Sequence, residues 1–293
     1  MQEIQPIDIK HVLSQAVLFW PRDSFIENPR LEAEILLCDT LSVERAWLYA
    51  HSDHLLTAEQ LATYKEKIHR RRSGEPIAYI TGRKEFWSLE FKVTPNTLIP
   101  RPETELLVET ALQIIDLHFP NENFIDILDI GTGSGAIAVA LTHERPNIRA
   151  VATDISFDAL KVACENAVRH GVRSRMKFVC ADCMCGLKAC NQFHIILSNP
   201  PYISHEERNE LPSEVLDYEP ALALFSDEDG LRAIRLIVSN AGRFLRQNGH
   251  LLCEIGWKQG EKVIEIAGIY FDQQARIIRD YSGRDRVLAV QAC

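Results

Sequence analysis

The sequence predicts an α/β protein in which a small helical domain precedes a mostly parallel sheet covered by helices on both faces. After Asn123, short apolar runs alternate with helical stretches, which is typical of repeated strand–helix units. The first 72 residues instead carry apolar positions at helical spacing. A length of 293 residues suits two domains of ordinary size.

Helix-end signals support the helical interpretation of the N-terminal region. Asn28 followed by Pro29 is typical of a helix start, because proline fits the first helical turn. Thr57 and Gln60 have the spacing of a capping box, in which each side chain binds a backbone N–H group of the other residue. The basic residues 69–72 suit a helix C-terminus, and this interpretation is favoured over a nucleic-acid patch.

A short hairpin is predicted between the two regions. Residues 84–93, KEFWSLEFKV, alternate in polarity and break around Ser88. Pro100 and Pro102 then hold the following segment extended. We therefore expect three parts: an N-terminal helical substrate-recognition domain at 1–83, a hairpin linker at 84–100 and the α/β domain at 101–293.

The α/β region contains seven predicted strands. The last two have only a short glycine-containing turn between them, so they should form an antiparallel pair at the sheet edge. The predicted strands are 125–130, 150–155, 176–180, 194–198, 250–255, 275–278 and 286–290. The predicted helices of this region are 136–143, 157–170, 231–245 and 259–267.

Charge and hydropathy exclude several classes of protein. Lys and Arg number 32 against 41 Asp and Glu, a net charge of −9, whereas proteins that hold nucleic acid usually present a basic face. We therefore expect no direct nucleic-acid substrate. The longest apolar run is shorter than the roughly 20 residues that cross a bilayer, and the start MQEIQPIDIK is not a signal sequence, so a cytoplasmic location without membrane contact is expected.

The chain has eight cysteines, and free thiols are the expected state because the chain is too large to need disulfides. Cys180, Cys183, Cys185 and Cys190 lie close together and raise the hypothesis of a zinc site. Cys180 ends a predicted strand, however, and no second C-x-x-C pair or paired histidine completes a tetrahedral set. We expect no metal.

A glycine turn is the clearest local signal. The strand that ends in Asp129 and Ile130 runs into a turn that opens the helix at Ala136; the turn consists of Gly131, Thr132, Gly133, Ser134 and Gly135. Such a turn lets the backbone approach a ligand closely, and the helix N-terminus favours an anion. Asp154 follows at the end of the next predicted strand, where a carboxylate can accept hydrogen bonds from ribose hydroxyls. By itself, this pattern fits a dinucleotide site equally well.

A second motif, Asn199-Pro200-Pro201-Tyr202, follows an apolar strand and so should lie at the carboxyl edge of the sheet. The side-chain oxygen of Asn199 and the carbonyl of Pro200 can both accept hydrogen bonds from one NH2 group. The two prolines fix these acceptors because proline locks φ and has no N–H of its own. Tyr202 offers a ring face to a flat amide or base.

Together these motifs resemble those of class I, seven-stranded, Rossmann-like S-adenosylmethionine methyltransferases that act on amino groups. Further segments extend the resemblance to the HemK/PrmC family, the protein-(glutamine-N5) methyltransferases of peptide chain release factors. These segments are EPIAYITG at 75–82, LIPRPETE at 98–105, YEP at 218–220 and EIG at 254–256. The match runs from about Glu75 to the C-terminus, while the helical N-terminus is similar to the family only in size and character.

The resemblance implies a set of site residues. S-adenosylmethionine would be held by the loop from Asp129 to Gly135, by Asp154, by Asp182 and Cys183 after the third strand, and by Asn199. The family usually has an aromatic residue where this chain has Cys183, which leaves stacking on the adenine open. Residues Asn199 to Tyr202 would receive the glutamine of a Gly-Gly-Gln loop in a class 1 release factor, with Asn199, Pro200 and Tyr202 as the catalytic set.

The predicted chemistry needs alignment more than proton removal, because the lone pair of an amide nitrogen is delocalised. Two acceptors on the NH2 hydrogens would polarise the nitrogen and point it at the methyl group, so no dedicated general base is expected. Glutamine methylation of a ribosomal protein stays open. DNA adenine-N6 methylation is disfavoured by the acidic residues that follow the motif. A nicotinamide oxidoreductase or a nucleotide-binding module is disfavoured because no proton-relay group is found at the strand ends.

Overall fold

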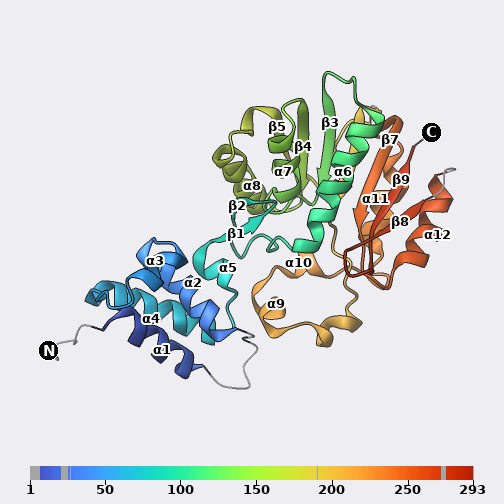
Figure 1. Cartoon of the computed structure of the whole chain (residues 1–293). Helices are drawn as coiled ribbons and strands as arrows, with labels where there is room; N and C mark the ends of the chain where they lie inside the picture. The colour runs from blue at the N-terminus through green and yellow to red at the C-terminus, as the bar shows by residue number, and fades with distance from the viewer. Residues whose placement is uncertain (1–6, 21–25, 27, 190, 272–274, 293) are drawn as a thin grey trace. The chain divides into compact units, whose positions relative to one another are not determined.

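The computed structural model describes residues 7–20, 26, 28–189, 191–271 and 275–292. The chain forms two compact units (Figure 1). The first consists of Met1–Gly82 together with Pro212–Tyr218, and the second of Arg83–Leu211 together with Glu219–Cys293. A short segment from the middle of the chain therefore belongs to the N-terminal unit. Nothing in the local sequence of this segment indicates that assignment.

The first unit is helical. Asn28 caps the second helix by accepting a hydrogen bond from the N–H of Leu31, and Thr57 and Gln60 form the predicted capping box. Both predicted helix starts are thus confirmed. The helices of this unit are α1 (Ile9–Phe19), α2 (Pro29–Leu41), α3 (Arg45–Ala50), α4 (Ala58–Arg72), α5 (Ile77–Thr81) and α9 (Ser213–Tyr218).

The core of the first unit is formed by side chains from α1, α2 and α4, among them Leu36, Leu37 and Tyr64. The α9 segment is joined to this unit by polar contacts. Arg71 pairs with Glu214 at 2.9 Å, and the hydroxyl of Tyr218 donates to the carbonyl of Ser73 at 2.9 Å.

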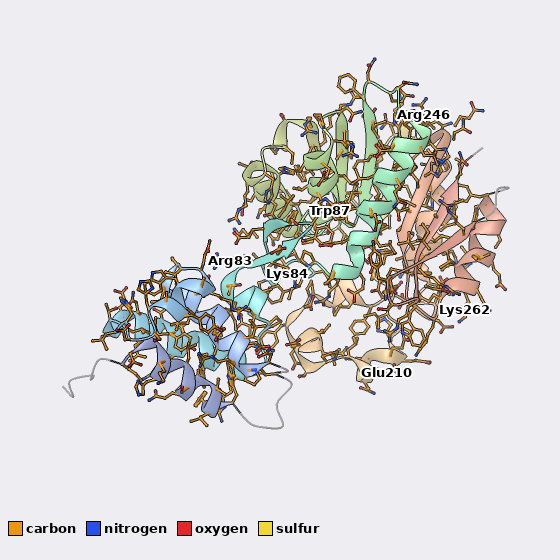
Figure 2. All side chains as sticks on the ribbon, viewed as in Figure 1. Arg83, Lys84, Trp87, Glu210, Arg246 and Lys262 are labelled. Carbon is orange, nitrogen blue, oxygen red and sulfur yellow. The ribbon has the colours of Figure 1, made fainter. Side chains whose placement is uncertain are left out.

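The second unit begins with the predicted hairpin, β1 (Arg83–Phe86) and β2 (Leu89–Lys92). Trp87 and Ser88 form its turn with φ of 53° and 57°, the backbone that a tight two-residue hairpin needs. Trp87 also joins the hairpin to the rest of the unit (Figure 2). Its backbone N–H donates to Glu105 at 2.8 Å, and its indole N–H donates to Glu144 at 2.7 Å.

A seven-stranded sheet forms the centre of the second unit, with the strand order β5-β4-β3-β6-β7-β9-β8. The pairs β3–β4, β4–β5, β3–β6 and β6–β7 are parallel, whereas β9 runs antiparallel to both β7 and β8. The predicted α/β fold and the antiparallel edge pair are therefore confirmed. The strands are β3 (Ile125–Ile130), β4 (Ile148–Asp154), β5 (Met176–Cys180), β6 (Phe193–Ser198), β7 (Leu245–Glu254), β8 (Arg276–Arg279) and β9 (Asp285–Gln291).

Helices cover both faces of this sheet (Figure 1). Alternate strand residues point to opposite faces, so Ile127 packs with α6 and α7, while Leu128 packs with α11 and α12. The helices of this unit are η1 (Pro102–Thr104), α6 (Glu105–His118), α7 (Ala136–Glu144), α8 (Phe157–Arg169), η2 (Arg173–Arg175), η3 (Glu206–Glu210), α10 (Ala221–Leu224), α11 (Arg232–Ala241) and α12 (Gly260–Tyr270). Among the described residues, none of the helices has the length and hydropathy of a membrane span.

One long helix, α6, is not predicted from the sequence. Its buried residues Leu107, Val108, Ala111, Ile114 and Ile115 recur at helical spacing, so the signal is present in the chain. The helix starts directly after η1, whose last residue is Thr104.

Asn166, on α8, connects three segments of the second unit through hydrogen bonds. It is fully buried, and its Nδ2 donates to the carbonyls of Lys92 (2.9 Å) and Ser134 (2.8 Å). Its Oδ1 accepts from the N–H of Lys92 at 2.8 Å. The hairpin, the glycine turn and α8 are thereby held together by one side chain.

Replacing Asn166 by alanine should lower the free energy of unfolding by about 3 kcal/mol, because three backbone groups, one buried and two partly buried, lose their partner. Urea unfolding followed by circular dichroism measures this effect. The matched control is Asn96→Ala at an exposed position, which should stay within about 0.5 kcal/mol of the wild type. Equal unfolding midpoints for the two variants would contradict this connecting role.

Candidate functional site

The site lies where the strand order reverses. β3 and β6 are neighbours in the sheet but their following helices lie on opposite faces, which is the arrangement at which open α/β sheets bind ligands beyond the carboxyl ends of their strands. The hydroxyl of Ser198, the last residue of β6, donates to the carbonyl of Ile130, the last residue of β3, at 2.8 Å. Both predicted motifs follow these two residues, so the fold brings the glycine turn and the Asn-Pro-Pro-Tyr corner side by side.

The glycine turn has the conformation that a ligand-binding loop needs. Gly131 and Gly133 have φ of 69° and 55°, and a Cβ added to either would meet no atom within 4 Å. The loop is fixed to the neighbouring strand β4, because the N–H of Thr132 donates to the carbonyl of Thr153 at 2.9 Å. Ser134 is buried. The open space above both glycines is where a ligand could contact the backbone.

Gly135 has a different reason to be glycine. Its φ is 83°, and an added Cβ would lie 3.1 Å from the Cβ of Ala163 on α8. Gly135→Ala should destabilise the protein by about 2 kcal/mol, because the left-handed backbone of a residue with a Cβ is strained by roughly 1–2 kcal/mol and the neighbouring helix must also give way.

The matched control is Gly268→Ala on α12, where φ is not positive and no atom lies within 4 Å of the added Cβ. Alanine in an exposed helix should stabilise by up to about 1 kcal/mol. Thermal unfolding should therefore shift in opposite directions for the two variants. A shift in the same direction would refute the packing argument for Gly135.

Asp129 is fully buried below the turn. Its Oδ2 accepts a hydrogen bond from the hydroxyl of Thr132 at 2.6 Å, and burial raises the pKa of its carboxyl group to about 6. Its Oδ1 has no hydrogen-bond partner among the described residues. Asp129 thus stabilises the conformation of the turn through Thr132, and its Oδ1 remains available as a hydrogen-bond acceptor.

Asp154, the last residue of β4, lies beside the turn. Its Oδ2 accepts from the N–H of Gly133 and its Oδ1 from the N–H of Ser156, both at 2.8 Å. Burial raises the pKa of Asp154, and these backbone hydrogen bonds oppose the rise. A carboxylate has about four acceptor positions, so each oxygen can still bind a hydroxyl group.

Asp182 and Cys183 follow β5 and also reach this edge. The N–H of Ala181 donates to the carbonyl of Asp154 at 3.0 Å, which places the start of their turn at the end of β4. Cys183 has a φ of 51°, a conformation that non-glycine residues adopt rarely. Burial raises the pKa of its thiol to about 12, so the thiol stays protonated at neutral pH. Of the four clustered cysteines, Cys190 lies outside the described residues.

The Asn-Pro-Pro-Tyr corner is held by partners from distant parts of the second unit. Nδ2 of Asn199 donates to the hydroxyl of Thr104 at 3.0 Å. The hydroxyl of Tyr202 donates to Oε1 of Glu254 at 3.3 Å, and the carbonyl of Tyr202 accepts from the side chain of Gln259 at 2.9 Å. Pro200 is buried and Pro201 is half-buried. The arrangement presents the acceptor end of the Asn199 amide, since its donor end is already used.

Three of these partners are not predicted as site residues, namely Thr104, Glu254 and Gln259. Thr104 and Glu254 lie in segments that carry the family resemblance, LIPRPETE and EIG, so the sequence did contain a signal for two of them. Gly230 packs directly against the corner, because a Cβ there would lie 2.1 Å from the carbonyl oxygen of Tyr202.

Part of the acidic stretch after the corner is paired with arginines. Glu219 is buried, pairs with Arg101 and accepts from the N–H of Ile99 at 3.2 Å. Glu214 pairs with Arg71 within the first unit. Two of the acids that appeared to repel phosphates are therefore neutralised by arginines, whereas other acids of the stretch, such as Glu210, are exposed (Figure 2).

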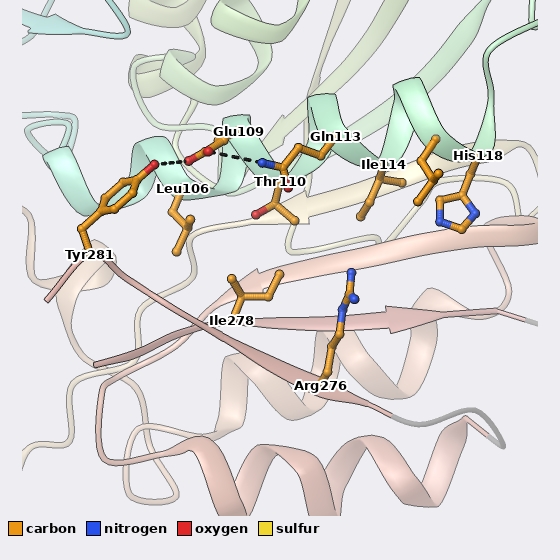
Figure 3. Close-up of a pocket in the computed structure, with 10 residues that line it drawn as sticks. Leu106, Glu109, Thr110, Gln113, Ile114, His118, Arg276, Ile278 and Tyr281 are labelled. Carbon is orange, nitrogen blue, oxygen red and sulfur yellow. Dashed lines mark hydrogen bonds between the residues drawn. The ribbon is translucent and has the colours of Figure 1, made fainter. Parts of the chain in front are cut away.

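A groove of about 400 Å³ lies elsewhere, between α6 and β8 (Figure 3). Leu106 from α6 and Ile278 from β8 line its opposite sides, and the hydroxyl of Tyr281 donates to Glu109 at 2.6 Å at one end. None of the predicted site residues lines this groove.

Comparisons with solved structures show the same fold. A methyltransferase from Pyrococcus furiosus matches with a TM-score of 0.50 and 15% identity, over 78% of this chain and 98% of that one. The hMettl16 catalytic domain matches with a TM-score of 0.56 and 14% identity, over 78% of this chain and 80% of that one. The second unit therefore has the fold of known methyltransferases.

Comparisons of sequence are more specific. The PrmC N-terminal domain family matches residues 12–82, and the methyltransferase small domain family matches residues 105–217. The chain spans about half of the length of the bifunctional methyltransferase of Rickettsia typhi, with 39% identity over 90% of this chain and 54% of that one. The release factor glutamine methyltransferase of Buchnera aphidicola is 42% identical over 90% of this chain and 93% of its own length. That of Nitratidesulfovibrio vulgaris is 39% identical over 97% of both chains. The chain therefore belongs to the family of release factor glutamine methyltransferases.

Proposed function

We propose that this protein transfers a methyl group from S-adenosylmethionine to the side-chain nitrogen of the glutamine in the Gly-Gly-Gln motif of peptide chain release factors. The names of the relatives from Buchnera aphidicola and Nitratidesulfovibrio vulgaris support the substrate. The observation that carries the proposal is the anchored amide of Asn199, whose Nδ2 is bound by Thr104 and whose Oδ1 is left to accept from an NH2 group. Translation takes place in the cytosol, which is the proposed site of action.

The residues at this edge of the sheet fit S-adenosylmethionine. Gly131 and Gly133 leave open space for an approaching ligand, and the carboxylate of Asp154 retains acceptor positions for ribose hydroxyls. Asp182 and Cys183 would border the base. When bound, the cofactor supplies an activated methyl group on a sulfonium centre.

The protein's own residues would orient the amide nitrogen. Oδ1 of Asn199 and the carbonyl of Pro200 accept the two hydrogens of the glutamine NH2 group, which polarises the nitrogen and directs it towards the methyl group. Holding the reacting atoms in line lowers the barrier by several kcal/mol, with roughly 7–11 kcal/mol as the limit for ideal orientation. Methylation makes the two protons on the nitrogen acidic, so one of them can leave to water, directly or through the Asn199 side chain, without a dedicated base.

Mass spectrometry of a purified release factor after incubation with enzyme and S-adenosylmethionine tests the proposal. We expect one added methyl group on the glutamine of the Gly-Gly-Gln motif and none when that glutamine is replaced by alanine. Ribosomal proteins and an adenine-containing DNA duplex serve as comparison substrates in parallel reactions. Methylation of either in place of the release factor would reject the proposal.

A further inference from the structure

Glu254, the last residue of β7, is a buried carboxyl group to which the predicted chemistry gives no role. Only 1% of its surface is exposed. Its Oε1 accepts from the hydroxyl of Tyr202, and no lysine, arginine or histidine among the described residues forms an ion pair with it. Buried carboxylates usually pair with a cation, as Glu219 does with Arg101. The nearby Arg286 is instead paired with Asp280 at 3.2 Å. A buried acid without a cationic partner, beside a reaction site, needs a reason.

Thr104 lies beside both this carboxyl group and the Asn199 amide. Its hydroxyl accepts from Nδ2 of Asn199 at 3.0 Å, and hydrogen bonding from the same hydroxyl lowers the pKa of Glu254 against the effect of burial. The hydroxyl has one proton and can serve either neighbour as donor. Which way this proton points therefore depends on the charge of Glu254.

The charge of Glu254 decides which end of the Asn199 amide faces the substrate. An ionised carboxylate only accepts, so Thr104 must donate to Glu254 and must then accept from Nδ2 of Asn199. Oδ1 consequently faces away from Thr104, where it can accept from a substrate NH2 group. A protonated Glu254 can donate to Thr104, whose own proton is then free for Oδ1 of a flipped amide. The flipped amide would present NH2 to NH2 and repel the substrate.

We propose that Glu254 is a positioning residue for methyl transfer, whose carboxylate acts through the Thr104 hydroxyl to keep Oδ1 of Asn199 directed at the substrate amide. This inference rests on the proposed function, because the orientation matters only for a substrate that carries an NH2 group. Tyr202 donates a hydrogen bond to the same carboxylate. Glu254 therefore helps to fix both the first residue of the motif, Asn199, and its last residue, Tyr202.

The surroundings of Glu254 raise the pKa of its carboxyl group towards neutral pH. Burial raises the pKa to about 7; Thr104, Arg286 and Tyr202 oppose the rise, and the nearby charge of Glu103 adds to it. Cys253, the neighbouring residue on β7, stays protonated because burial raises the pKa of its thiol. The carboxylate form gains population as the pH rises through about 7, so turnover should rise with pH in the same range.

The test measures kcat for release factor methylation at saturating S-adenosylmethionine, from about pH 5 to about pH 9. Glu254→Gln should lower kcat by about 100-fold and remove the rise near neutral pH. Glutamine does not ionise, and its amide can donate hydrogen bonds as well as accept them, unlike a carboxylate. The affinity for S-adenosylmethionine, from calorimetry, should stay within about threefold of the wild type. Glu261→Gln on the exposed face of α12 is the matched control, with unchanged kcat and pH profile.

Two further variants keep the test decisive if Glu254→Gln is unstable. Thr104→Val removes the hydroxyl without much change in shape and should lower kcat by about 100-fold, while Thr104→Ser should retain most of it. An unchanged pH profile in Glu254→Gln, or equal kcat for the valine and serine variants, would overturn the positioning role. A wild-type enzyme that leaves the release factor unmethylated would reject the proposed function and the inference with it.

Discussion

Replacing Asn199 by alanine is expected to lower turnover of the release factor glutamine by about 100- to 1,000-fold, the usual loss when a group aimed at the reacting centre is removed. The affinity for S-adenosylmethionine should change little, because the glycine turn and Asp154 form the proposed cofactor cradle without contacting Asn199 through any hydrogen bond that the structure records. The loss should therefore appear in kcat at saturating cofactor.

Calorimetry with S-adenosylmethionine and a methyl-transfer assay separate the two effects. Asn96→Ala, a change at an exposed position outside the site, should leave both measurements unaltered. If Asn199→Ala retained near-normal turnover, the amide acceptor would have no central role. If it lost cofactor affinity and turnover in equal measure, Asn199 would be mainly a cofactor ligand.

Asp154→Ala should weaken binding of S-adenosylmethionine by about 100-fold or more. Two hydrogen bonds from ribose hydroxyls to a carboxylate contribute about 1.5–3 kcal/mol each, and 1.4 kcal/mol corresponds to a factor of ten. The variant also removes the acceptor for the N–H of Gly133, so the glycine turn loses one of its supports. Turnover should recover in part when the cofactor concentration is raised, in contrast to Asn199→Ala.

The control for this variant is Asp158→Ala, an exposed aspartate on α8 that pairs with Lys161. It should bind the cofactor as the wild type does. Because burial raises the pKa of Asp154, wild-type affinity should also begin to fall at a higher pH than for an ordinary aspartate as the solution is acidified. Equal calorimetric affinity for the two alanine variants would remove Asp154 from the cofactor site.

The alternation of apolar runs and helical stretches was sufficient to predict the sheet and most of its helices, because both periodicities are local properties of the chain. The hairpin, the two helix starts and the antiparallel edge pair were likewise predicted from short segments. The helix α6 was missed although its apolar spacing is regular. The placement of Pro212–Tyr218 in the first unit follows from its contacts with residues far away in sequence, which no local pattern records.

The residues of the candidate site were partly predictable for the same reason. A glycine turn after a buried strand and two prolines after another are local signals, and the resemblance to a known family gave them proposed roles. Parallel neighbouring strands then bring the ends of β3, β4 and β6 to one edge, which the alternation of elements already implies. The proposed roles of these residues stay predictions for the experiments described above.

The sequence by itself determined the alternation of elements, the glycine turn and the rigid Asn-Pro-Pro-Tyr corner, because each depends on neighbouring residues. Only the tertiary structure decided which end of the Asn199 amide is occupied, since Thr104 lies 95 positions before it. It also decided that Tyr202 contacts a carboxyl group 52 positions further along the chain. Hydrogen bonds of this kind depend on how strands and loops meet in space, and the order of the residues alone does not record that meeting.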